Sequence, residues 1–120
     1  MSDATNDAPK LSLRIDLGDG ARLGPGKAAL LKQIAEIGSI GGAATALGMS
    51  YPRALKLIAQ LNNTFAAPVI TTQHGGPKGG GASLTAAGSQ ILSLYNAACT
   101  AAQTASTPHL AALNSMRKPD

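Results

Sequence analysis

Two short helical segments on either side of Gly48 most constrain the fold of this chain. Ser39 and Ser50 each precede one of them, and a serine in that position can accept a hydrogen bond from the free amides of a helix's first turn. The first segment, 40–47, is rich in glycine and alanine, whose small size lets a second helix approach closely. The second, 51–63, has apolar residues at helical spacing. We therefore expect two closely packed helices joined by a tight turn.

The second segment carries basic and polar residues near its start. Pro52 falls in the predicted first turn, where a proline costs no helical hydrogen bond. Tyr51, Arg53 and Lys56 lie on its outward side. Its apolar stripe consists of Ala54, Leu57 or Ile58, and Leu61. Two short helices joined by a glycine-containing turn, the second opening with basic groups, are typical of a DNA-binding helix-turn-helix.

The N-terminal part of the chain predicts a hairpin and then a helix. Residues 11–17 alternate apolar and polar side chains, which is the period of a strand with one buried face. Gly18-Asp19-Gly20 favours a turn, and residues 21–23 form the expected return strand. A helix of about three turns follows and ends at Gly38. Residues 1–10 are polar and are typical of a disordered lead.

A second hairpin is predicted after the helix pair, with strands over residues 68–72 and 82–84. The nine residues between them include five glycines and the single cation Lys78. Such a flexible, positively charged tip is typical of a wing, which we place at residues 72–82. A wing lays its backbone amides and its lysine along a phosphate backbone or a minor groove.

The last predicted helix is long for a chain of this size. Thr85 is its expected N-cap, and the helix runs from Ala86 to about Ala105, roughly 30 Å at about 1.5 Å per residue. A core this small cannot cover its whole apolar side, so we expect part of it to meet another subunit. Pro108 is expected to break the helix, leaving residues 106–120 as a weak short helix or a loose tail.

Composition narrows the architecture further. Aromatic residues make up 2% of the chain, so the core must come from Leu, Ile and Ala, which suits close-packed helices. A length of 120 residues allows one small domain, which we assign to residues 11–105. The expected fold class is mainly α with small β-hairpins: a winged helix-turn-helix with an N-terminal hairpin and a long C-terminal dimerisation helix.

The positive charge of the chain is concentrated in one part of it. The net charge is +4, and the residues before position 37 carry equal numbers of acidic and basic groups. The remainder has one acid, Asp120, against five basic residues: Arg53, Lys56, Lys78, Arg117 and Lys118. A long stretch with a single terminal carboxylate is a candidate surface for phosphate.

Several function classes are excluded on chemical grounds. No carboxylate lies between Glu36 and Asp120, so Cys99 and the serines lack an orienting His–Asp pair for nucleophilic catalysis. His74 and His109 have no acidic neighbours that would complete a metal site. We therefore expect no enzyme activity, catalytic residue, metal or cofactor. The first residues do not form a secretory signal and no apolar run is long enough for a membrane span, so we expect a cytoplasmic protein.

A family resemblance is carried by motifs in a specific order. They are Leu23-Gly24-Pro25-Gly26, Gly38-Ser39-Ile40, Ala43-Ala44, Leu47-Gly48-Met49-Ser50-Tyr51, Asn62-Asn63, the Gly75–Gly81 tip and Leu84-Thr85-Ala86-Ala87-Gly88. In this arrangement, the chain resembles the DNA-binding domain of ModE, the molybdate-responsive regulators. The resemblance implies a homodimer in which helix 51–63 enters the major groove, the wing touches flanking DNA and the last helix takes part in dimerisation.

The chain departs from the family pattern in both DNA-facing elements. Pro52 stands where a basic residue is usual, and Arg53 is expected to take over its contact. Leu55 replaces a tryptophan, which we expect to reduce core packing, and Pro77 is expected to stiffen or redirect the tip. No residues match the family's oxyanion-binding motif, so we expect a single-domain form whose effector is unknown, with molybdate implied by the family alone.

The residues expected to contact double-stranded DNA are Ser50, Tyr51, Arg53, Lys56, His74 and Lys78. Arg53 is placed to hydrogen-bond a base edge, whereas Lys56 and Lys78 suit phosphates. Ser50 is first a cap and also a phosphate donor, and Tyr51 either bonds a phosphate or seals the turn. His74 adds pH-dependent positive charge. Together they predict a sequence-specific transcriptional regulator that binds operator DNA as a homodimer.

Two other functions stay open. The small net charge and Pro52 also allow a non-specific DNA-binding or protein-interaction module. Alternatively, Arg117, Lys118 or helix amides at a dimer interface allow a sensor of a small oxyanion.

Overall fold

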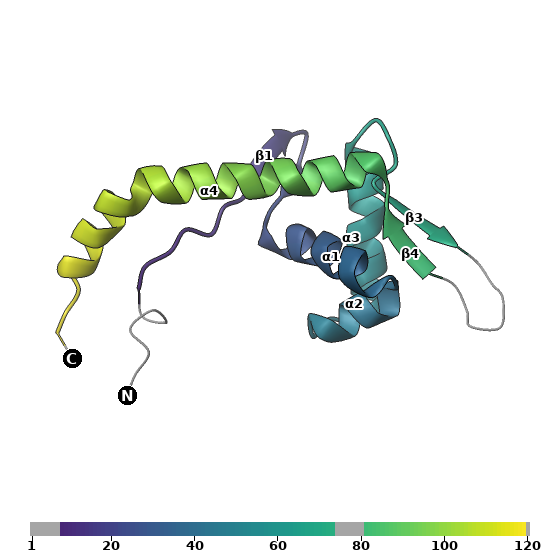
Figure 1. Cartoon of the computed structure of the whole chain (residues 1–120), viewed down its shortest axis with the longest axis horizontal. Helices are drawn as coiled ribbons and strands as arrows, with labels where there is room; N and C mark the ends of the chain where they lie inside the picture. The colour runs from purple at the N-terminus through teal and green to yellow at the C-terminus, as the bar shows by residue number, and fades with distance from the viewer. Residues whose placement is uncertain (1–7, 74–80, 120) are drawn as a thin grey trace.

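The structure is a computed structural model that describes residues 8–73 and 81–119. Its elements follow the order β1 (Ile15–Gly18), β2 (Ala21–Leu23), α1 (Pro25–Ile37), α2 (Ile40–Ala46), α3 (Tyr51–Thr64), β3 (Ile70–Gln73), β4 (Gly81–Leu84) and α4 (Ala86–Ser115). Helices α1 to α3 pack together, and α4 runs past them as a long rod (Figure 1). The predicted winged helix-turn-helix fold is confirmed. Most of the predicted disordered lead, residues 1–7, lies outside the described residues.

The core forms where α1 meets the other helices and the second hairpin. Helix α1 begins at Pro25 and ends at Gly38, whose φ of 84° is a left-handed conformation that glycine adopts without strain. Its fully buried side chains are Leu30, Leu31 and Ile34, joined by Leu61 of α3 and by Val69. As the composition predicts, apart from Tyr95 the buried core is aliphatic.

Both predicted serine caps are confirmed. The Ser39 hydroxyl accepts from the Gly42 amide at 3.0 Å, and the Ser50 hydroxyl accepts from the Arg53 amide at 3.2 Å. Gly48, with a φ of 67°, turns the chain between α2 and α3. These local hydrogen bonds fix where each helix of the motif begins.

The connection after α3 is held by side chains that bond to the backbone. Asn62 accepts through Oδ1 from the amides of Val69, at 2.7 Å, and Ile70, at 3.3 Å. Thr85 donates its hydroxyl to the Pro68 carbonyl at 2.6 Å and accepts from the Gly88 amide at 3.0 Å. The end of α3, the start of β3 and the start of α4 are thereby tied together.

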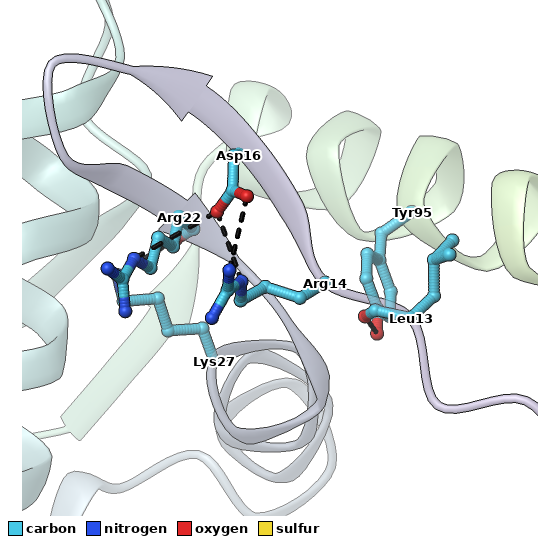
Figure 2. Close-up of polar contacts among 6 residues, drawn as sticks. All are labelled: Leu13, Arg14, Asp16, Arg22, Lys27 and Tyr95. Carbon is cyan, nitrogen blue, oxygen red and sulfur yellow. Dashed lines mark hydrogen bonds and ion pairs between the residues drawn. The ribbon is translucent and has the colours of Figure 1, made fainter.

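The first strand is shorter than predicted. Only Ile15–Gly18 pairs with β2, and the side chains of Leu11 and Leu17 are 37% and 46% exposed. The residues before Ile15 instead extend along α4, where the Tyr95 hydroxyl donates to the Leu13 carbonyl at 2.6 Å (Figure 2). The Leu11 amide donates to Gln103 Oε1 at 3.0 Å. The alternating pattern therefore marks extended chain, of which only the last part is a strand.

The predicted end of the last helix is wrong. Helix α4 continues through Pro108 to Ser115, so most of the expected tail, residues 106–120, is helical. A proline removes one backbone donor, but the helix is solvent-exposed around this position, where water can satisfy the freed carbonyl. The helix bends over its last turns (Figure 1). Pro108 thus fits a bent helix rather than a break.

Gly88→Ala should destabilise the fold, because a Cβ there would collide with the Val69 carbonyl oxygen. We expect a loss of about 1–3 kcal/mol, which lowers Tm by at least about 4 °C. Gly26→Ala is the matched control, since its Cβ would meet nothing within 4 Å. Thermal unfolding followed by circular dichroism checks this, and equal Tm values for the two variants would contradict the packing.

Tyr95→Phe should weaken the attachment of the N-terminal segment by about 0.5–1.5 kcal/mol, because it removes the bond to Leu13. Burial, and then the Cys99 side chain, raise the pKa of Tyr95 from 10.0 to about 12. The neutral hydroxyl therefore contributes its full stabilisation below the unperturbed pKa of 10.0. That stabilisation is lost as the pH rises towards the folded-state pKa of about 12. Urea unfolding across this range should show the two proteins converging. A constant difference would count against the bond.

Candidate nucleic-acid interface

Helix α3 presents one polar face to solvent. Its buried side chains are Ala54, Ile58 and Leu61. At 3.6 residues per turn, or about 100° per residue, the opposite side is centred on Lys56. The exposed residues around that centre are Pro52, Arg53, Ala59, Gln60 and Asn63. Because α3 contains no acidic residue, this face is positive and is free to approach an anion.

Arg53 and Lys56 occupy different parts of this face. Lys56 lies near its centre, and Arg53 is displaced from it by about 60°, in a row with Gln60. Both cations are exposed, and the described residues place no carboxylate within ion-pair distance of either. The structure therefore brings the two predicted cations onto one accessible surface.

Ser50 and Tyr51 lie where α3 begins. The Ser50 hydroxyl accepts from the Arg53 amide, which leaves its proton available for a donor role. The Tyr51 side chain is 52% exposed and borders a hollow of about 410 Å³. The Tyr51 hydroxyl is therefore on an accessible part of the surface, and its contact with phosphate stays a prediction.

This hollow separates α3 from the second hairpin. It is lined by Ser39, Ile40, Gly41, Tyr51, Leu55, Thr72, Gln73 and Gly81. Leu55 is 41% exposed, so the expectation that its smaller side chain reduces core packing is wrong. The residue instead contributes to the surface between the helix and the wing, because it lies about 100° from Lys56 on the side of Tyr51.

The base of the wing is fixed to the helical core. Strands β3 and β4 pair in register from Ile70 opposite Leu84 to Gln73 opposite Gly81. The Ala82 amide donates to the Gly38 carbonyl at 2.9 Å, which anchors β4 at the end of α1. The predicted tip contacts, His74 and Lys78, lie outside the described residues.

Sequence reasoning missed four exposed polar residues next to these sites. Gln60 and Asn63 follow Lys56 by four and seven residues, so extending the helical spacing would have found them. Thr72 and Gln73 line the hollow from β3. Nothing in the local sequence of β3 indicates that the wing folds back beside α3.

Similarity to known proteins agrees with this geometry. The sequence pattern of bacterial regulatory helix-turn-helix proteins of the lysR family matches residues 27–89, which is just over half of the chain. The chain belongs to this family. It therefore carries the DNA-binding helix-turn-helix of a family of bacterial transcriptional regulators.

Individual relatives support the resemblance to ModE. The molybdenum-pterin-binding protein MopB of Rhodobacter capsulatus is 46% identical over 78 residues, which cover 65% of this chain and 29% of that protein. The molybdenum transport protein ModE of Azotobacter vinelandii is 35% identical over 94 residues, or 78% and 34% of the two chains. The transcriptional regulator ModE of Yersinia pestis is 38% identical over 81 residues, or 68% and 31%. The present chain thus spans about a third of the length of these relatives.

Residues 8–73 and 81–119 lack both a metal-binding cluster and a helix suited to span a membrane. They contain no group of three His, Cys, Asp or Glu side chains arranged to hold a metal ion. None of their helices combines the length and the apolar character that crossing a membrane requires.

Proposed function

We propose that this protein is a transcriptional regulator of the ModE type that binds operator DNA sequence-specifically as a homodimer. The observation that carries the proposal is the acid-free outward face of α3, on which Arg53 and Lys56 are both exposed. The major groove of B-DNA is about 12 Å wide and admits one helix. Helix α3 fits this role, and a DNA-binding role places the protein in the cytoplasm.

The two cations of α3 have separate roles in this proposal. Arg53 hydrogen-bonds a base edge, because its guanidinium group matches the paired acceptors of guanine. Lys56 contacts phosphate as a point charge. Ser50 and Tyr51 donate to the backbone at the start of the helix, and His74 and Lys78 of the wing contact flanking phosphates. The hollow between α3 and β3 receives the sugar-phosphate backbone that runs between the two elements.

Exposed apolar side chains along α4, and Met116 directly after it, supply the dimer interface. Leu94 and Leu113 are each 61% exposed and Met116 is 82% exposed, and the described chain offers no element that covers them. Apolar side chains on a long helix gain stability by packing against a second copy. A dimer also places two α3 helices on one DNA molecule, which favours a palindromic operator.

Because relatives are named for molybdenum, the first operators to test lie upstream of molybdate-transport genes.

Arg53→Ala and Lys56→Ala should affect DNA binding differently. An operator selected from randomised duplexes provides the specific probe, and a scrambled duplex the non-specific one. Arg53→Ala should lose about 1–3 kcal/mol on the operator and relax its preference at one base position. Lys56→Ala should weaken both duplexes and reduce the slope of log K against log salt by about 0.9 per lost contact. Fluorescence anisotropy measures both effects. Equal losses on both duplexes for both variants would refute the assigned roles.

Leu94→Glu should convert the dimer to a monomer, because a charge would be buried in the interface. Asn96→Glu is the control, since it adds the same charge about 200° away on the exposed surface of α4. Analytical ultracentrifugation reports the mass of each variant. A wild-type monomer, or a Leu94→Glu dimer as tight as the control, would overturn this interface.

A further inference from the structure

A cluster of charged side chains lies on the N-terminal hairpin, outside the set of residues assigned to DNA binding above. The Asp16 carboxylate lies 3.0 Å from Arg14 Nε and 3.9 Å from Arg22 Nε. All three side chains are more than half exposed. Since the closer partner of the carboxylate is Arg14, the Arg22 guanidinium retains donors that face solvent (Figure 2).

Lys27 adds a second cation beside Arg22. Its ammonium group donates to the Arg22 carbonyl at 2.9 Å, which ties the start of α1 to β2. The ends of the Arg22 and Lys27 side chains lie next to each other, on the side of the hairpin away from Tyr95 (Figure 2). Partial burial, and then the positive charge of Arg22, lower the pKa of Lys27. The fold therefore holds two like charges close together, an arrangement that an anion would stabilise.

These two cations border a hollow beside the recognition helix. The hollow measures about 770 Å³, and its lining includes Arg22, Lys27 and the exposed residues Gln60 and Asn63 of α3. Asp19 of the hairpin turn is the one carboxylate in that lining, so cations outnumber it two to one. Thus the hairpin contributes positive charge to the C-terminal end of the helix that reads DNA.

The hairpin and the wing lie on opposite sides of α3. Leu55 lines the hollow next to the wing, whereas Gln60 lines the hollow next to the hairpin. These residues are separated by about 140° around the helix. The same arrangement is visible in Figure 1, where β1 and β3 lie to either side of α3. A helix in the major groove has one row of phosphates on each side, so each hairpin is next to a different row.

We propose that the N-terminal hairpin is a second DNA-backbone contact, in which Arg22 and Lys27 bind phosphates on the wall of the major groove opposite the wing. This inference rests on the proposed insertion of α3 into the groove. Arginine and lysine contacts to phosphate need exposed side chains rather than a closed pocket, and this open, polar hollow provides them. Gln60 and Asn63 can add neutral hydrogen bonds from α3 to the same strand.

The test is the salt dependence of DNA binding by an Arg22→Gln/Lys27→Gln double variant. Lys32→Gln and Lys32→Ala are matched controls, because Lys32 is an exposed cation of α1 that does not line the hollow. On the selected operator, the double variant should bind more weakly at low salt, and the log–log salt slope should fall by about 0.9 for each lost phosphate contact. Circular dichroism verifies that every variant is folded.

Ethylation interference on the operator gives a second readout. Phosphates on the side of α3 opposite the wing should interfere with wild-type binding and lose that effect in the double variant. An unchanged slope and pattern, with wild-type DNA binding intact, would overturn the second contact alone. A wild type that binds no duplex would overturn the proposed function as well. A double variant that keeps its slope but loses a thermal shift caused by inorganic phosphate would show a small-anion site instead, and would also overturn the proposal.

Discussion

The structure depends on the backbone of one fully buried residue, Val69. Its amide is held by Asn62 at the end of α3, and its carbonyl accepts from the Thr85 amide at 3.0 Å. Gly88 of α4 packs directly against that carbonyl, where a larger residue has no room. Helix α3, the second hairpin and α4 therefore meet at a single point. Because buried backbone groups must be paired, the three elements are fixed relative to one another.

This rigid connection determines where the basic side chains lie relative to one another. A net charge of +4 is small, and an even distribution would leave little attraction for a polyanion. Instead, Arg53 and Lys56 lie on the acid-free face of α3, while Arg22 and Lys27 lie beside its far end. The hollows on the two sides of α3 are bounded by the wing and by the N-terminal hairpin. We infer that the fold gathers a modest charge into one surface shaped to follow a helical groove.

Much of the motif could be predicted because its signals are local. A serine hydroxyl reaches the amide three residues later, as Ser39, Ser50 and Thr85 all do, so a cap depends on a few neighbouring residues. Glycine at a helix end, as at Gly38, likewise follows from the conformation of that one residue. The site was less predictable. Tyr51 and Arg53 lie on the exposed side as expected, but the role of Leu55 depended on a hairpin that folds back from residues distant in sequence.

The sequence by itself determined the helix-turn-helix, its caps and the concentration of net positive charge after α1, where Asp120 is the single acid. Only the tertiary structure decided which face of α3 lies beside the wing, and that Arg22 and Lys27 lie next to its other end. It also decided that residues 11–14 extend along α4, because the Tyr95 hydroxyl and the Gln103 amide supply the partners that a longer β-strand would have offered. Similarly, α4 continues through Pro108 because its exposed backbone can be hydrated there. In each case the deciding partner, whether a distant side chain or solvent, is absent from the local sequence.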